Sequence, residues 1–205
     1  MVPKRPHRIH RDLQPDRLLT AYACGVFPMA DDAGELHWFA PDPRAIIDLD
    51  AVSVSRSLRA VIRRGVFKIT VNQAFGEVIR ACAERDEGTW ISDEIASAYA
   101  ALHELGFAHS VESWRDGELA GGLYGVSIGA AFFGESMFHR ATDASKVALV
   151  ALAERMNERG LTLLDVQFMT PHLRRFGAVE IPRREYEGRL RRAIQRPVSF
   201  VDAGG

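Results

Sequence analysis

The sequence predicts an α+β fold in which helices cover both faces of a mixed β-sheet. After an N-terminal segment, hydrophobic periodicity indicates one strand, two helices, three strands, a helix, a strand and a final helix, in that order. The 205 residues are 47% hydrophobic and 26% charged, which is typical of a globular protein rather than a disordered or fibrous one. This length and composition indicate one or two compact domains.

Charge and cysteine content exclude several function classes. Lys and Arg number 26 against 27 Asp and Glu, so a polyanion would need a local basic patch rather than an overall basic field. Cys24 and Cys82 form no CxxC pair, which excludes a disulfide scaffold and a zinc ribbon. No run of about 18 apolar residues occurs, and the first residues lack the apolar region of a signal peptide. We therefore predict a cytoplasmic protein that spans no membrane.

The chain divides into three predicted parts, with boundaries at residues 14 and 54. Residues 1–14 contain four Lys or Arg and two prolines but few apolar residues, so we expect a flexible basic arm. Residues 15–54 begin with a helix, favoured by Pro15 in its first turn and by Gly25 as its stop, and continue with a proline-rich loop and a short strand. We expect a small N-terminal α/β domain here, followed by the main domain over residues 55–205.

The first half of the main domain carries a basic stripe. Arg56, Arg59 and Arg63 recur at helical spacing in residues 55–65, with no acid beside them. Residues 67–71 have the composition of a strand, and Asn72 and Ser92 are the predicted N-caps of the two helices that follow. The second of these helices should end before residue 106.

From residue 108 onward the pattern changes to an antiparallel meander. Strands are predicted at residues 109–114, 118–128 and 129–136, with a turn at Asp116-Gly117. A helix over residues 146–160, an apolar strand over residues 161–169 and a final helix near residues 184–194 complete the domain.

Two carboxylates stand out because they lie in apolar surroundings. Alternation along the strand of residues 161–169 places Asp165 and Gln167 on one face. A carboxylate in such a strand is costly unless it is paired, so Asp165 has either a structural or a chemical role. Glu135, in FFGESMF, could bind a cation or could be a surface residue at a turn. The histidines of HELGFAH are six residues apart rather than four, so we predict no metal site there.

Several motifs together strongly resemble the leucyl/phenylalanyl-tRNA–protein transferases, the bacterial N-end-rule aminoacyltransferases. They are WFAPDPRAI, EGTWIS, LHELGFAHSVE, GGLYGVSIGAAFFGESMF, DASKVAL, LDVQF and GAVEIPRREY, and the match runs from about Pro15 to the last helix. The resemblance implies a GNAT-like catalytic domain behind the small N-terminal domain. It also implies transfer of Leu or Phe, less readily Met, from aminoacyl-tRNA to proteins that begin with Arg or Lys, which marks them for degradation. No cofactor and no metal are expected, because an aminoacyl ester is already activated.

The resemblance also assigns roles to individual residues. Asp165 would polarise Gln167, whose carbonyl helps to take a proton from the attacking amine, and Glu135 would pair with the Arg or Lys side chain of the acceptor. Trp38 and Trp90 would hold the 3′-terminal adenine by stacking. The aminoacyl pocket would be lined by Leu123, Phe132, Met137, Leu149, Leu152 and Leu164. The tRNA backbone would be contacted by Arg56, Arg59, Arg63 and Arg64.

Some positions depart from the family pattern. We expect a shortened N-terminal domain. Phe39 stands where a second Trp is common, and Asp143 stands where Asn often precedes ASK. Leu152 occupies a position where an aromatic residue can occur, which enlarges the pocket and leaves the preference between Leu and Phe open.

Two alternative functions stay open alongside a monomeric aminoacyltransferase. One is a GNAT-type acyl-CoA N-acyltransferase, although RRFGAV at residues 174–179 only half matches the expected phosphate-binding loop. The other is a non-catalytic module that recognises N-terminal Arg or Lys through Glu135. The presence of both Asp165 and Gln167 argues against this second alternative.

Overall fold

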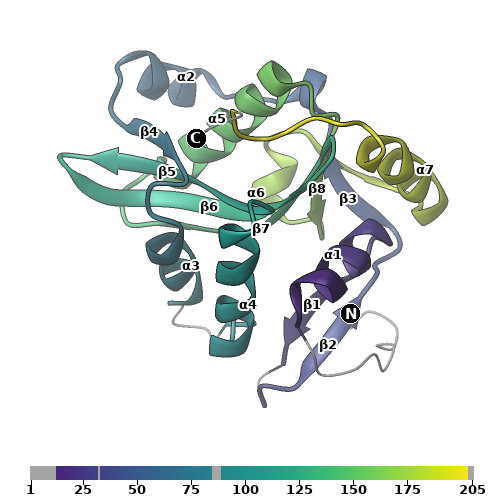
Figure 1. Cartoon of the computed structure of the whole chain (residues 1–205). Coiled ribbons are helices and arrows are strands. Elements are labelled where there is room, and N and C mark those ends of the chain that lie inside the picture. Colours follow the sequence, from purple (N-terminus) through teal and green to yellow (C-terminus); the bar gives the residue numbers. More distant parts are fainter. Residues whose placement is uncertain (1–12, 32, 85–88, 203–205) are drawn as a thin grey trace.

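The computed structural model describes residues 13–31, 33–84 and 89–202, so the predicted basic arm lies almost entirely outside the described residues. A seven-stranded sheet in the order β4-β5-β6-β7-β8-β3-β9 forms the centre of the molecule (Figure 1). The β7–β8 pair is parallel and the other pairs of this sheet are antiparallel, which confirms the predicted mixed sheet. A separate two-stranded sheet joins β1 to β2.

The N-terminal segment contributes to both sheets. It forms α1 (Pro15–Ala23), β1 (Phe27–Ala30), β2 (Leu36–Phe39) and β3 (Arg44–Ile47). Strand β3 lies between β8 and β9 and pairs Ile46 with Asp165, so the segment that we expected to form a small domain supplies a strand to the large sheet. All four residues of β3 are buried, and the period-two alternation that marks a half-buried strand is therefore missing from this stretch.

The basic stripe and the two helices after it have the predicted order. The elements are the 3₁₀-helix η1 (Leu49–Ala51), α2 (Arg56–Arg63), β4 (Lys68–Val71), α3 (Phe75–Ala83) and α4 (Asp93–Glu104). Ser92 caps α4 as predicted, since its hydroxyl accepts a hydrogen bond from the Ile95 N–H at 3.2 Å. The predicted cap at Asn72 is wrong: its side chain bonds His109 Nδ1 at 3.0 Å, and α3 starts three residues later.

The second half of the chain contains the predicted meander and helices. Its elements are β5 (Ala108–Arg115), β6 (Glu118–Ile128), β7 (Ala131–His139), α5 (Ala144–Arg159), β8 (Leu163–Gln167), α6 (Pro171–Arg174), β9 (Ala178–Ile181) and α7 (Arg183–Ile194). Asp116 and Gly117 both have positive φ, as a tight hairpin turn requires. Elements α6 and β9 were not predicted, because four residues are too few to show a period.

Helices cover both faces of the large sheet, as the sequence predicts. One core cluster joins the sheet to α1, α3, α4 and α7, and a second cluster joins the opposite face to α2 and α5. Figure 1 shows α3 and α4 on one side of the sheet and α2 and α5 on the other. None of the helices in the described part of the chain has the length and apolarity that crossing a membrane requires.

Candidate active site

A cavity of about 740 Å³ opens where β7 and β8 meet the start of α5. This volume falls in the range of small-molecule sites. Its walls come from β6, β7, β8, the first turns of α5 and the loop that contains Trp90. Apolar residues such as Phe138 and Leu173 line it together with polar and charged residues that include Glu135, Gln167 and Lys146, so the cavity combines apolar walls with many polar groups.

Five of the six residues expected in the aminoacyl pocket line this cavity. They are Leu123, Met137, Leu149, Leu152 and Leu164. The sixth, Phe132, is fully buried behind the cavity wall, where its ring packs at 4.9 Å from the ring of Phe200. Phe132 therefore supports the wall from behind and is not part of the cavity lining.

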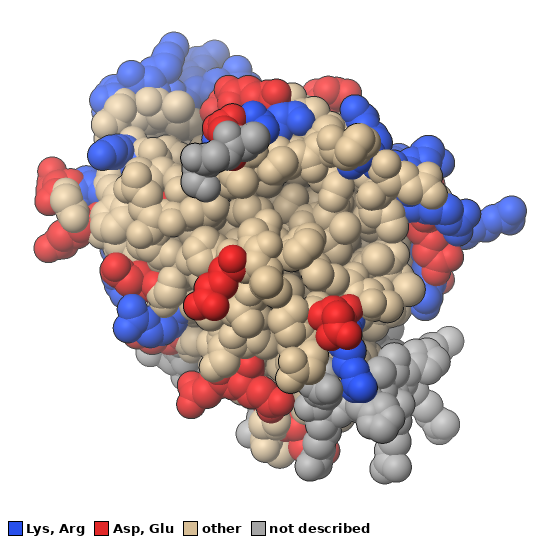
Figure 2. Space-filling view, viewed as in Figure 1, with Lys and Arg blue, Asp and Glu red and all other residues tan. Residues whose placement is uncertain are grey.

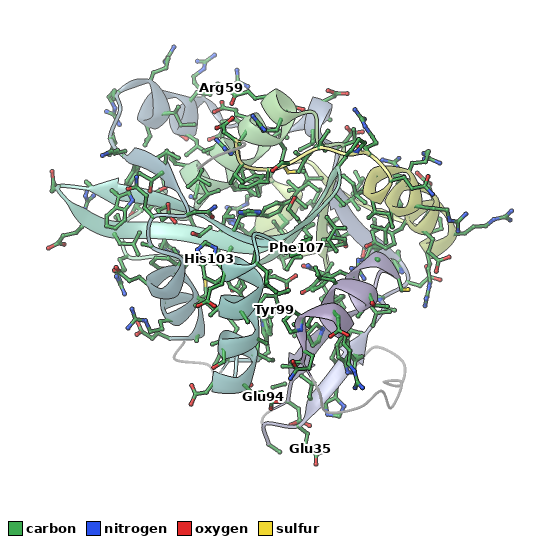
Figure 3. The ribbon with its side chains drawn as sticks, in the orientation of Figure 1. Glu35, Arg59, Glu94, Tyr99, His103 and Phe107 are labelled. Carbon is green, nitrogen blue, oxygen red and sulfur yellow. The ribbon has the colours of Figure 1, made fainter. Side chains whose placement is uncertain are left out.

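Glu135 lies in the cavity lining, where four elements meet. Tyr99 on α4 donates a hydrogen bond to Glu135 Oε2 at 3.2 Å, and the Gln167 side-chain amide donates to Oε1 at 3.3 Å. Tyr22 on α1 bonds the hydroxyl of Tyr99. Figure 3 shows Tyr99 on the side of α4 that faces α1. The Glu135 side chain thus lines a cavity and does not lie at a surface turn.

Burial dominates the acid–base behaviour of this cluster. Desolvation raises the pKa of Glu135 to about 8, and the hydrogen bonds from Tyr22 and Tyr99 only partly offset it. Burial also raises the pKa of both tyrosines well above the usual value, so they remain hydrogen-bond donors at neutral pH. A cation placed next to Glu135 would favour its ionised form, so binding of a cation would lower the pKa of this carboxyl.

The raised pKa of Glu135 makes a prediction about stability. The folded-state pKa lies above the reference value of 4.5, so ionisation destabilises the fold as the pH rises from 4.5 to about 8. Glu135→Gln stays neutral at every pH. The difference in free energy of unfolding between this variant and the parent should therefore shift in favour of the variant by at least about 1 kcal/mol from pH 5 to pH 9, since one pKa unit is worth about 1.4 kcal/mol. Urea unfolding at both pH values measures this. The control is Glu84→Gln, at an exposed position. An equal effect of Glu135→Gln at both pH values would contradict the raised pKa of Glu135.

Asp165 is fully buried and accepts four hydrogen bonds. Arg44 on β3 donates through Nε to Oδ1 at 2.9 Å and through Nη2 to Oδ2 at 2.7 Å. The Tyr186 hydroxyl on α7 donates to Oδ2 at 2.6 Å. The backbone N–H of Gln167 donates to Oδ1 at 2.9 Å. Asp165 therefore contacts Gln167 through the main chain, whereas the resemblance implies that it acts on the side-chain amide.

Gln167 ends β8 in an unusual backbone conformation. Its φ is +58°, in the left-handed region that residues other than glycine rarely adopt. The side chain lines the cavity and reaches Glu135. Asp165 and Gln167 are thus neighbours, as the alternation predicts, and Glu135 lies with them.

The two tryptophans expected to stack on adenine occupy different environments. Trp90 is partly exposed and lines the cavity. Trp38 on β2 is only 4% exposed and packs in the core, where its ring has no open face for a base. The backbone N–H of Ala30 donates to the Trp90 carbonyl at 3.2 Å, which ties the Trp90 loop to β1.

The basic stripe lies on a separate part of the surface. Arg56, Arg59, Arg63 and Arg64 are all exposed on or just after α2, which packs on the core through Leu58. Figure 2 shows Lys and Arg side chains gathered over α2, and Figure 3 labels Arg59 there. A local patch of this kind is what a polyanion partner needs in a chain with a net charge of -1.

Four residues of the site escaped the sequence analysis. Arg44 lies in a strand too short to show a period, and Tyr22, Tyr99 and Tyr186 lie on the apolar faces of helices, where they have the pattern of ordinary core residues. Their hydroxyls and the guanidinium of Arg44 face the two carboxylates. Only tertiary structure brings these groups together, because Arg44 and Asp165 are 121 positions apart.

Comparison with known proteins connects this site to one family. The model for "Leucyl/phenylalanyl-tRNA protein transferase" matches residues 46–191, and the model for the N-terminal domain of the same proteins matches residues 11–42. The solved structure of L-PGS from Bacillus licheniformis covers 78% of this chain and 55% of its own, with 16% identity and a TM-score of 0.41. A score at this level does not establish a shared fold.

Relatives with high identity span most of the chain. A leucyl/phenylalanyl-tRNA–protein transferase of Anaeromyxobacter sp. (strain K) is 54% identical over 190 residues, which cover 91% of this chain and 82% of that protein. The proteins of the same name from Gloeobacter violaceus and Herpetosiphon aurantiacus are each 55% identical over 189 residues, covering 92% of this chain and 97% and 98% of theirs. The chain therefore belongs to the leucyl/phenylalanyl-tRNA–protein transferase family.

Proposed function

We propose that this chain transfers Leu or Phe, and less readily Met, from aminoacyl-tRNA to the α-amine of proteins that begin with Arg or Lys. The observation that carries the proposal is that Glu135 and Gln167 contact each other in the lining of a cavity that also has apolar walls. The apolar part suits an uncharged side chain on the donor, and the carboxyl suits a cationic side chain on the acceptor.

The reaction is the aminolysis of an ester. The acceptor α-nitrogen attacks the aminoacyl carbonyl carbon, the carbon–O3′ bond breaks, and the proton lost by the nitrogen ends on the ribose 3′-oxygen. The ester is already activated, so alignment of the two substrates supplies most of the rate. The Gln167 side chain would orient the amine through its carbonyl oxygen while Glu135 holds the acceptor side chain. Asp165 would keep Gln167 in place from behind.

Donor selection would come from the shape of the apolar cavity. Leu123, Leu149, Leu152 and Leu164 present apolar side chains that are not branched at Cβ and that fit Leu or Phe. A pocket of this kind separates neighbouring apolar side chains by only about 1–3 kcal/mol, so Met should be accepted at a lower rate. Trp90 lines the cavity and is the residue we propose for stacking on the terminal adenine, and our proposal leaves out Trp38, which is buried.

The finer features of the proposal rest on the family resemblance. They are a GNAT-like arrangement of the catalytic domain, function as a monomer without a cofactor, and the marking of acceptor proteins for degradation. Charged tRNA is available where translation takes place, which supports a cytoplasmic site of action. The mixed sheet with helices on both faces supports the fold assignment.

The basic stripe makes a prediction about tRNA binding. Changing Arg56, Arg59 and Arg63 to Gln should weaken binding of all aminoacyl-tRNAs alike by about tenfold or more near physiological salt. The slope of the logarithm of the binding constant against the logarithm of salt concentration should become shallower by about 2–3, because each phosphate contact contributes about 0.9 to its magnitude. Filter binding at several salt concentrations measures both quantities.

A matched control for this prediction lies on α7 and just after its end. Arg191, Arg192 and Arg196 are also exposed, so changing them to Gln removes the same charge elsewhere on the surface. An equal effect of both triple variants would contradict a role for α2. A loss confined to one tRNA species would contradict contact with the backbone alone.

The donor experiment tests the proposed function. The purified chain is incubated with a peptide that begins with Arg and with tRNA charged with labelled Leu, Phe, Met or Ala, or with labelled acetyl-CoA. We expect label on the peptide from Leu and Phe, less from Met, and none from Ala. Transfer from acetyl-CoA alone would support the acyl-CoA alternative. Peptide binding with no transfer from any donor would support the non-catalytic module.

A further inference from the structure

The carboxylate of Asp165 has no free position for a proton or a substrate. Oδ1 accepts from Arg44 Nε and from the Gln167 backbone N–H, while Oδ2 accepts from Arg44 Nη2 and the Tyr186 hydroxyl. A carboxylate has about four lone-pair sites, and all of them are used. Asp165 is also 0% exposed and does not line the cavity. It therefore acts on the reaction only through the groups that it holds.

Arg44 and Tyr186 form a clamp around this carboxylate. The Arg44 guanidinium is 1% exposed and lies 4.6 Å from the centre of the Tyr186 ring and 4.8 Å from that of Phe27. Its remaining Nη1 donates to the Gly25 carbonyl at 3.0 Å. Gly25 has a φ of +74°, and a Cβ there would meet Tyr186 Cε1 at 2.8 Å, so only glycine lets the chain pass this close. The loop after α1, strand β3 and helix α7 are thus fixed to one another at Asp165.

The fourth donor to the Asp165 carboxylate, the backbone N–H of Gln167, connects this clamp to the proposed transfer reaction. Gln167 is held at a φ of +58°, a conformation that is unfavourable for residues with a Cβ. Its N–H bond to Asp165 opposes that cost, and the resulting turn directs the side-chain amide toward Glu135. If the carboxylate rotated, the amide of Gln167 would lose its anchor and the turn could relax.

We infer that Arg44 and Tyr186 are positioning residues, which fix the Asp165 carboxylate so that it holds Gln167 in its strained turn with the side chain facing the acceptor. This inference rests on the proposed function. Neither residue contacts the cavity, so neither should affect the binding of donor or acceptor. Their effect should appear in the rate of the bound complex, because small displacements of an aligning group cost rate rather than affinity.

Tyr186→Phe isolates the effect, because it removes one hydrogen bond to Asp165 and keeps the ring that packs on Arg44. We expect kcat for transfer of Leu to an Arg peptide to fall about tenfold, with KM for both substrates within twofold of the parent. The Gln167 backbone amide should also exchange with solvent at least about fivefold faster, measured by NMR. This second readout needs no turnover.

Leu190→Val is the matched control on the same helix. Leu190 is buried and packs against Gly25, but it makes no hydrogen bond to Asp165. The control should leave kcat and the exchange of the Gln167 amide unchanged. Unchanged kcat and exchange in Tyr186→Phe would overturn the inference, and so would equal losses in both variants, which would indicate general loosening of α7. If the parent chain itself transfers nothing, the proposed function fails, and amide exchange still decides whether the clamp holds Gln167.

Discussion

Glu135→Gln is expected to lower kcat/KM for peptides that begin with Arg or Lys by about 30- to 700-fold and to leave binding of aminoacyl-tRNA unchanged. The substitution keeps the shape of the side chain and its position next to Tyr99 and Gln167 but removes its ability to ionise next to a cationic acceptor. Loss of one partner of a buried charge pair costs about 2–4 kcal/mol, which corresponds to this range of rates. Steady-state transfer assays with Arg, Lys and Ala peptides measure the effect.

Glu84 provides the matched control for this substitution. It lines the same cavity, but its side chain is exposed and lies 3.7 Å from Arg140. An exposed pair of this kind contributes little, so Glu84→Gln should change kcat/KM by less than about fivefold. Undiminished use of Arg peptides by Glu135→Gln would remove the acceptor-binding role of Glu135.

Arg44→Met should reduce the free energy of unfolding by about 3–5 kcal/mol and abolish measurable transfer. The substitution leaves the Asp165 carboxylate buried without its cation, which is among the most destabilising changes a core can suffer. Adding Asp165→Leu removes the stranded charge, so the double variant should recover at least about 2 kcal/mol relative to the sum of the single changes. Activity should stay lost, because the Gln167 amide then has no anchor. Urea unfolding and transfer assays on the four proteins separate the two effects.

The exposed pair of Arg189 and Glu185 on α7 is the control for the double-mutant cycle on Arg44 and Asp165. Its atoms lie 2.7 Å apart, as close as those of the buried pair, but both side chains contact solvent. The same double-mutant cycle there should give a coupling below about 1 kcal/mol. Comparable coupling at both sites would contradict the view that burial makes the Arg44–Asp165 pair strong. Recovery of activity in the double variant would contradict the role of the carboxylate in holding Gln167.

A turn and a helix cap could be predicted from the sequence because each depends on residues that are close together in the chain. The Asp116-Gly117 turn fixes a hairpin, and Ser92 offers its hydroxyl to the first turn of α4, so both are readable from a few neighbouring residues. Strand β3 was missed because it is four residues long and buried on both faces, which removes the alternation that marks a strand. Asn72 was misassigned as a cap because its partner, His109, is 37 positions away.

The candidate site also contains some residues that could be identified from the sequence and others that could not. Asp165 and Glu135 were identifiable because a carboxylate in apolar sequence needs an explanation. Their partners were not, since Tyr22 and Tyr99 are 77 positions apart and each has the pattern of a core residue. Burial of Trp38 likewise depends on packing around β2 that no periodicity reports. Sequence therefore indicated which groups were anomalous, and tertiary contacts explained how each is held.

The most direct test of the account is the identity of the acceptor. The assay combines the purified chain with tRNA charged with labelled Leu. The acceptors are three peptides that differ only in their first residue, Arg, Lys or Ala, and an Nα-acetylated Arg peptide. Products are identified by mass spectrometry. We predict a Leu residue added to the N-terminus of the Arg and Lys peptides alone. Equal labelling of the Ala peptide, or any labelling of the acetylated one, would contradict the claim that Glu135 selects a cationic residue whose free α-amine attacks the ester.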